Sequence, residues 1–269
     1  MKPRLKRRFH LKIAFQERLV KTVCFFYALS RDAQSLKNRY QLKFDFEFEF
    51  QQNTGARPYY YVSGFDFPRM PVLTADQPET LQYFRWGLIP SWVKTSRQAL
   101  EIRSYTLNAR SDTVFDKPAF RNAIRQRRCL IPADGFYEWR LFQGRKYPYY
   151  IYFHDKTIFS FAGIWEEWVD PVTGECVKTY SILTTEANQL MAQIHNTKKR
   201  MPVILPREAE KTWLRPDLRR EEILELTKPL DSGLLAAHTV SKLITSRTAD
   251  RNVPTVQDYY EYPELAGCK

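Results

Sequence analysis

Three short apolar runs follow one another in residues 128–153, whose sequence is RCLIPADGFYEWRLFQGRKYPYYIYF. The runs are Cys129–Ile131, Gly135–Leu141 and Tyr147–Phe153, and the last two are rich in aromatic residues. Gln143-Gly144-Arg145 separates these two runs and carries a glycine, which permits a tight turn. Short apolar runs with turn residues between them predict consecutive β-strands.

Similar patterns on both sides of this stretch extend the predicted fold. We expect further strands at Gln82–Leu88, Ile158–Ile164, Val177–Thr184, Pro202–Leu205 and, from the alternation of phenylalanine with acidic residues, 44–50. We expect short helices at Ser30–Tyr40, Asp112–Gln126, Thr185–Ile194, Glu208–Leu214 and Arg220–Leu226, with Ser30 and Thr185 as N-caps and a kink at Pro118. The predicted fold class is α+β, with one domain over residues 24–269 whose core is a mostly antiparallel sheet or open β-barrel flanked by short helices.

The composition excludes several classes of protein. Of the 269 residues, 43% are hydrophobic and 15% aromatic, so the chain can bury a large core and is not wholly disordered. No run of 18 apolar residues occurs, and we therefore expect no membrane-spanning helix. The four cysteines form no CxxC pair, which is typical of a reducing compartment such as the cytoplasm and argues against a zinc finger or other metal site.

The charge is large and unevenly distributed. A formal net charge of +12 and a pI near 9.5 favour a polyanionic partner. Residues 1–23 hold eight lysines or arginines against one acidic residue, Glu17, so the rest of the chain is only mildly basic. A solvated surface without any nucleic-acid role would carry that remaining charge equally well.

Four polar side chains in apolar surroundings are candidates for chemistry, because a buried polar group costs free energy unless it has a partner. They are Cys24, Asn108, Glu138 and His195. Each also has a purely structural interpretation: a small core residue for Cys24, a turn for Asn108, a solvent-facing position for Glu138 and a satisfied core or surface residue for His195. Spacing alone does not decide between the two.

Four segments taken together resemble one family, the SRAP or SOS-response-associated peptidases, which shield abasic sites in DNA. They are RWGLIPSW (85–92), NARSD (108–112), RCLIPADGFYEW (128–139) and HN…RMP (195–202), and the similarity runs in order from Cys24 to about Ser241. The resemblance implies the SRAP fold, and it implies that the partner is single-stranded DNA that contains abasic sites. It also implies that no cofactor is needed and that the protein is a monomer associated with the nucleoid.

By this resemblance Cys24 is the catalytic nucleophile, which in the family becomes the N-terminal residue when the initiator methionine is removed. Here residues 1–23 precede it. They are a basic extension that is removed, for example by self-cleavage, or the product of a mis-assigned start in which Val23 marks a GUG codon. A third interpretation is that Cys24 is an internal core residue and the chemistry is lost.

An N-terminal cysteine carries an amine and a thiol on adjacent carbons. The α-amine has a pKa of about 7.7–8.0, so an appreciable fraction of it is neutral and nucleophilic near pH 7, unlike the amine of lysine. It can attack the C1′ aldehyde of a ring-opened abasic sugar to form a Schiff base. The thiol then closes a thiazolidine ring, which removes the iminium that would promote strand cleavage. The resemblance therefore implies a stable DNA–protein crosslink.

The resemblance also implies roles for other residues. Glu138 would shuttle protons with a pKa raised by its aromatic neighbours, His195 would donate a proton to the sugar oxygen or hold the aldehyde, and Asn108 would orient the amine. The expected DNA contacts are Arg110 to a phosphate, Trp86 and Trp92 to bases, Thr184 facing the site, and Lys198, Lys199 and Arg200 along the backbone path. For Trp86 a core position, and for the lysine loop a solvated surface, are equally open.

Two positions depart from the family pattern. Many relatives follow the cysteine with Gly-Arg, whose arginine contacts phosphate, whereas Phe25 and Phe26 stand here and this arginine is absent. Val240-Ser241 matches a Val-Ser element of the family, but the asparagine expected near Thr245-Ser246 is missing.

We therefore expect an abasic-site sensor with lyase-like Schiff-base chemistry that crosslinks to DNA through Cys24. Two alternatives belong to other classes. One is a thiol peptidase, a hydrolase in which Cys24 attacks a peptide carbonyl with Glu138 or His195 as the base. The other is a basic nucleic-acid-binding domain without enzymatic activity.

Overall fold

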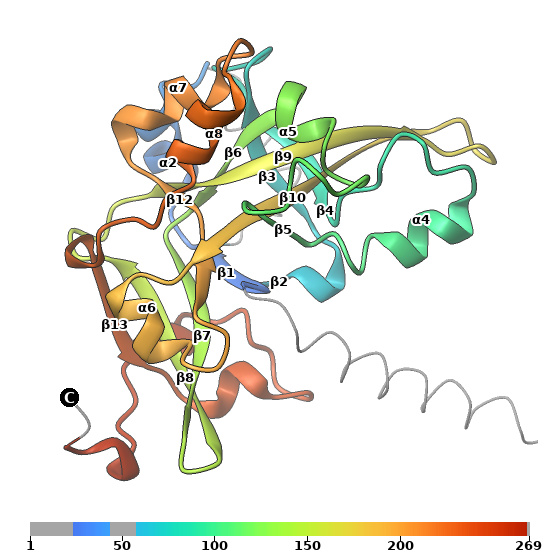
Figure 1. Cartoon of the computed structure of the whole chain (residues 1–269). Helices are drawn as coiled ribbons and strands as arrows, with labels where there is room; N and C mark the ends of the chain where they lie inside the picture. Colours follow the sequence, from blue (N-terminus) through green and yellow to red (C-terminus); the bar gives the residue numbers. More distant parts are fainter. Residues whose placement is uncertain (1–23, 44–57, 268–269) are drawn as a thin grey trace, which may run out of the picture.

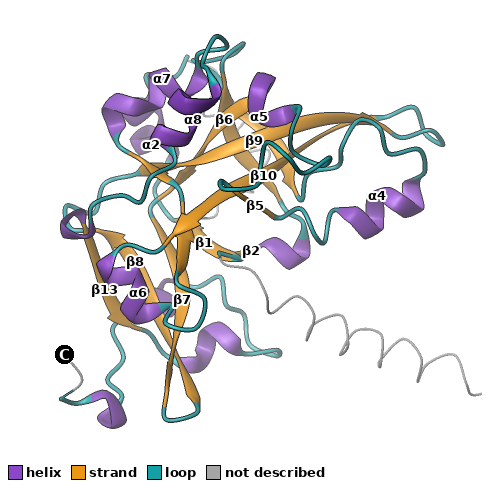
Figure 2. Ribbon diagram, viewed as in Figure 1, coloured by secondary structure: helices purple, strands orange, loops and turns teal. Residues whose placement is uncertain are grey.

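The computed structural model describes residues 24–43 and 58–267 (Figure 1). The predicted strand over 44–50 and the basic extension 1–23 lie outside the described residues. The described part is α+β, as expected, with two sheets and short helices around them (Figure 2).

The larger sheet closes on itself. Its strands are β3 (Arg69–Thr74), β4 (Gln82–Trp86), β5 (Asn108–Arg110), β6 (Arg128–Ala133), β9 (Phe159–Val169), β10 (Cys176–Glu186), β11 (Arg200–Pro202) and β12 (Ile204–Leu205). The path runs β10-β4-β3-β6-β9, and β9 pairs again with β10, which completes a barrel. Pairing is antiparallel except where β4 and β5 run parallel to β10.

The second sheet packs its inner face against the barrel. In spatial order its strands are β13 (Leu235–Thr239), β8 (Arg145–Phe153), β7 (Gly135–Phe142), β1 (Phe26–Leu29) and β2 (Tyr59–Ser63). Phe136 and Ile151 on that inner face share a core cluster with Phe161 and Ile131 of the barrel. The outer face carries Tyr137 and packs against the C-terminal segment.

The helices are short and lie outside the sheets. They are α2 (Ala33–Tyr40), α4 (Ser96–Ile102), α5 (Ala123–Gln126), α6 (Gln189–Ile194), α7 (Glu210–Leu214) and α8 (Arg220–Leu226). Figure 1 shows α2, α7 and α8 gathered at one end of the barrel and α6 beside β7. No helix among the described residues is long and apolar enough to cross a membrane.

The β7–β8 hairpin follows directly from its sequence. Its strands pair in regular register from Phe136 with Ile151 to Phe142 with Arg145, which leaves a two-residue loop of Gln143 and Gly144. Both loop residues have positive φ, at 46° and 75°. This is the type I′ geometry, whose twist matches that of the strands on either side.

Three expectations about helices were wrong in detail. Residues 112–126 form successive turns and only α5 is helical, because Pro118 has no N–H to donate and its ring disfavours a continuous helix. Asp32, not Ser30, caps α2 by accepting from the Ser35 N–H at 2.7 Å, while Ser30 bonds to Asp134. Asn188, not Thr185, caps α6, because β10 continues to Glu186.

Candidate active site

Cys24 lies two residues before β1, between the two sheets. Its N–H donates to Glu138 Oε1 of β7 at 2.7 Å, and its carbonyl accepts from Asn108 Nδ2 of β5 at 3.1 Å. The residue is 1% exposed and has a φ of 58°, in the left-handed region that costs energy for a residue with a Cβ. The two sheets thus hold Cys24 in a strained conformation with its nitrogen against a carboxylate.

Burial sets the protonation of the Cys24 thiol and of Glu138. Burial raises the pKa of the Cys24 thiol well above its usual value, and the charge of Glu138 adds to the effect. Burial likewise raises the pKa of Glu138 to about 7, although the Cys24 and Trp139 N–H groups, which favour the carboxylate, oppose the shift. Glu138 is therefore near half-protonated at neutral pH and can both give and accept a proton.

His195 ends α6 and faces Glu138. Its Nε2 lies 4.0 Å from Glu138 Oε2, and its Nδ1 accepts from the Arg200 N–H at 3.4 Å. Burial lowers the pKa of His195 to about 4, so the ring is neutral at pH 7. With Nδ1 acting as an acceptor, the proton resides on Nε2 and points toward the Glu138 side. His195 can act there as a hydrogen-bond donor without carrying charge.

Two further groups were not identified from the sequence. Asn196 donates from Nδ2 to the Leu141 carbonyl at 2.8 Å and accepts from the Leu141 N–H at 3.1 Å. Its place directly after His195 is the signal that would have found it. Tyr27 and Tyr180 share a hydrogen bond of 3.1 Å between their buried hydroxyls, and their pKa values are raised by burial and in part by the nearby Cys24.

Three of the expected DNA contacts gather around Asp112. Arg110 forms an exposed ion pair with Asp112, and Arg200 Nη1 lies 3.9 Å from the same carboxylate. Arg200 Nη2 also donates to the Thr184 carbonyl at 2.8 Å and to its hydroxyl at 3.0 Å, so buried Thr184 supports Arg200 and is not itself accessible. Lys198 and Lys199 are exposed in the loop between His195 and Arg200.

The two tryptophans occupy different environments. Trp86 is fully buried in the core, where its Nε1–H donates to the Leu107 carbonyl at 2.8 Å. The expectation that Trp86 stacks on DNA bases is therefore corrected in favour of the core role, because no face of its ring is accessible. Trp92 is 48% exposed and remains a candidate for stacking.

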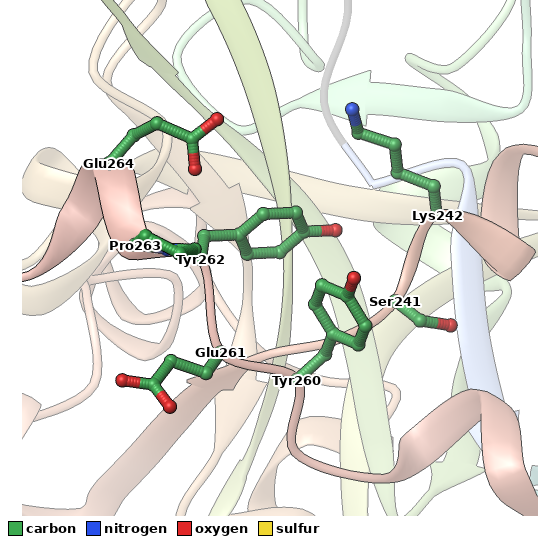
Figure 3. Close-up of a pocket in the computed structure, with 7 residues that line it drawn as sticks. All are labelled: Ser241, Lys242, Tyr260, Glu261, Tyr262, Pro263 and Glu264. Carbon is green, nitrogen blue, oxygen red and sulfur yellow. The ribbon is translucent and has the colours of Figure 1, made fainter.

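A surface cavity lies in the C-terminal part of the described chain. Its volume is about 570 Å³, and it is lined by Ser241, Lys242 and Tyr260–Glu264 in the C-terminal segment (Figure 3). Glu261 and Glu264 make it unsuitable for a polyanion. Within residues 24–43 and 58–267, no three His, Cys, Asp or Glu side chains gather in a way that could hold a metal ion.

Comparison with known proteins points to one family. A family model described as SOS response associated peptidase (SRAP) matches residues 23–247. The abasic site processing protein YoqW of Bacillus subtilis (strain 168) is 42% identical over 179 residues, which cover 66% of this chain and 76% of that protein. The abasic site processing protein HMCES of Gallus gallus is 34% identical over 194 residues, covering 64% of this chain and 56% of that protein.

A solved structure shares the fold as well. The crystal structure of a protein from Bacteroides thetaiotaomicron superposes with a TM-score of 0.82 at 41% sequence identity. The match covers 88% of this chain and 100% of that one.

Proposed function

This chain belongs to the SOS response associated peptidase family, and we propose from that premise that it processes abasic sites in single-stranded DNA by bonding to them covalently through Cys24. The abasic site processing proteins among its relatives support the substrate. The observation that carries the chemistry is the Cys24 nitrogen, 2.7 Å from a carboxyl group whose pKa is about 7.

The reaction begins when Cys24 is the N-terminal residue, so that its nitrogen is an amine. The neutral amine adds to the C1′ aldehyde of the ring-opened sugar and forms a carbinolamine. Glu138 in its acid form protonates the departing hydroxyl, which leaves as water, and a C=N bond remains. The 2.7 Å contact with the nitrogen puts Glu138 close enough to the reacting carbon for this transfer.

The thiol completes the reaction. The Cys24 sulfur adds to the carbon of the C=N bond and its proton passes to the nitrogen, which gives a five-membered thiazolidine without any oxidant. The raised pKa of the thiol keeps that proton available until the ring closes. Asn108 holds the Cys24 carbonyl at 3.1 Å, which orients amine and thiol toward one point. His195 donates from Nε2 to the sugar oxygen.

The proposal requires that residues 1–23 be absent from the reacting protein, since an amide nitrogen is not nucleophilic. Self-cleavage before Cys24 would produce the free amine, with Glu138 or His195 as the base. This step is the peptidase activity considered above, and it would precede the crosslinking reaction.

The test compares a chain that starts Met-Cys24, from which the methionine is removed, with the full chain from Met1. Each is mixed with a labelled single strand that contains one abasic site and is run on a denaturing gel. We expect a heat-stable shifted band from the short chain. Cys24→Ser should lose this band because an alcohol closes no thiazolidine, whereas Cys176→Ser, which changes an exposed cysteine, should keep it.

The outcomes separate the candidate functions. A band from the full chain, together with an intact mass that lacks residues 1–23, would establish self-cleavage. Loss of residues 1–23 with no band would favour a peptidase. The absence of a band from either chain would refute covalent abasic-site processing.

A further inference from the structure

Arg140 lies on the same strand as Glu138 of the proposed active site. It follows Glu138 by two residues on β7, and the regular pairing of β7 with β8 puts both side chains on the same face of the sheet. Two residues along a strand correspond to about 7 Å. The Arg140 guanidinium lies near the Phe142 ring, and so on the side of Glu138 that leads to the hairpin turn.

The guanidinium of Arg140 has no anionic partner among the residues that the structure describes. Its Nε is buried and makes no hydrogen bond, and the contact found for the group is the Phe142 ring, 5.9 Å from Cζ. Arg39, which is also partly buried, differs in having an anionic partner, Glu210. An unpaired, half-buried cation is costly, and an anion from outside the protein would relieve that cost.

A second cationic segment begins next to Arg140. The two hydrogen bonds between Asn196 and the backbone of Leu141 attach the loop 196–199 to β7 at the residue after Arg140. This loop carries Lys198, which is exposed and forms no ion pair with any described residue. Burial is the main cause that lowers the pKa of His195, and the charges of Lys146 and then of Lys198 add to it, which indicates that both lysines lie near the site.

We propose that Arg140 and Lys198 form a phosphate-binding site on the hairpin side of Glu138 and His195, which takes a backbone phosphate next to the abasic sugar. The inference rests on the proposed function for its substrate. Guanidinium binds phosphate through two parallel hydrogen bonds, and Lys198 adds a flexible point charge. Arg110 and Arg200 lie on other strands, β5 and β11, so the DNA strand would be held from two directions.

The test measures binding of the full chain to a fluorescein-labelled single strand of DNA without any lesion, with fluorescence anisotropy as the readout. The salt concentration is varied from roughly 50 to 200 mM, because the release of counterions from DNA makes the affinity depend on salt. Arg140→Gln should weaken binding roughly tenfold, since it removes a charge-assisted contact. It should also reduce the slope of log affinity against log salt by about 0.7, the value for one phosphate contact on a single strand. Lys198→Gln should act in the same direction with a smaller loss.

Arg215→Gln is the matched control, because Arg215 is an exposed arginine after α7 that pairs with Asp217, away from β7. It should change affinity less than twofold. If Arg140→Gln and Lys198→Gln both behave like this control while the chain starting at Cys24 still crosslinks to an abasic strand, the phosphate site is refuted and the proposed function stands.

The same experiments also distinguish the opposite outcome, in which the phosphate site is supported and the proposed function is refuted. A loss of affinity and of salt slope in Arg140→Gln, with no crosslink from the unsubstituted short chain, would support the phosphate site and refute the proposed function. Thermal unfolding checks that Arg140→Gln is folded. If it is not, the exposed Lys198→Gln carries the same test, and an unchanged slope there overturns the inference.

Discussion

Burial shifts the two titrating residues of the site in opposite directions. Desolvation disfavours the charged form of each group, so the pKa of Glu138 rises to about 7 and that of His195 falls to about 4. At neutral pH His195 is a neutral donor and Glu138 exchanges a proton readily. In the proposed reaction, the same physical cause would therefore give different proton-transfer roles to two residues whose Nε2 and Oε2 atoms lie 4.0 Å apart.

The raised pKa of Glu138 predicts how stability depends on pH. The folded protein holds this proton more tightly than the unfolded chain, so stability is lost as the pH rises from 4.5 to about 7. The glutamine of Glu138→Gln does not titrate, so the stability of this variant does not fall for this reason as the pH rises. We expect the variant to be more stable than the unsubstituted protein by ~2–3 kcal/mol at pH values above the folded pKa.

The measurement is urea unfolding of both proteins in acid and in mildly alkaline buffer. The lowered pKa of His195 has the opposite effect, because the protein loses stability as the pH falls from 6.5 to about 4. His195 is present in both proteins, so its contribution cancels when their stabilities are compared. A stability difference that stays the same in both buffers would show that Glu138 is not the group that titrates.

At the scale of elements, β7 is the strand that organises the site. It carries Glu138 and Arg140, and it anchors the loop after His195 through Leu141. It begins at Gly135, over which the ring of Tyr150 from the neighbouring strand packs. A Cβ at Gly135 would lie 2.3 Å from atoms of that ring, so the absence of a side chain is what allows the two strands to pack here.

Gly135→Ala should therefore destabilise the protein. The added methyl group must displace the Tyr150 ring, and overpacking of this kind costs about 1–3 kcal/mol. Gly233→Ala is the control, because a Cβ there meets only ordinary contacts, at 3.5 Å from Asp231 or further. The free energy of unfolding in urea distinguishes them, and equal values for the two variants would contradict the packing described for Tyr150.

At the scale of the whole molecule, the helices that cover one end of the barrel are held by buried charge. Arg39 of α2 contacts Glu210 of α7 through two hydrogen bonds, at 2.6 and 3.0 Å, and both side chains are largely buried. Arg39 also donates to the Ile158 carbonyl at 3.0 Å. The pair thus joins α2, α7 and the segment that leads into β9.

Glu210→Gln should lower the free energy of unfolding by about 3–5 kcal/mol, because it leaves the Arg39 charge buried and unpaired. Glu101→Gln breaks the exposed pair with Arg97 on α4 and should cost under about 1 kcal/mol. Denaturant unfolding measures both. Similar costs for the two variants would mean that the Arg39 guanidinium finds water or another partner when Glu210 loses its charge.

The sequence allowed much of this fold to be predicted because its signals are local. Two short apolar runs separated by the Gln143-Gly144 turn predicted the β7–β8 hairpin, and the described residues confirm it. The helix over 112–126 was wrong and β13 was missed, because turn-rich segments and strands in the C-terminal region depend on what they pack against.

The sequence by itself determined which residue types are present for chemistry: a cysteine, a glutamate, a histidine and an asparagine in separate segments. Only the tertiary structure decided that Cys24, Asn108 and Glu138 meet where two sheets join, that Trp86 is buried, and that Arg140 lacks a partner among the described residues. The physical reason is that burial and charge pairing depend on segments far apart in the chain. Side-chain periodicity reports which face of a strand a residue occupies, but not what lies opposite that face.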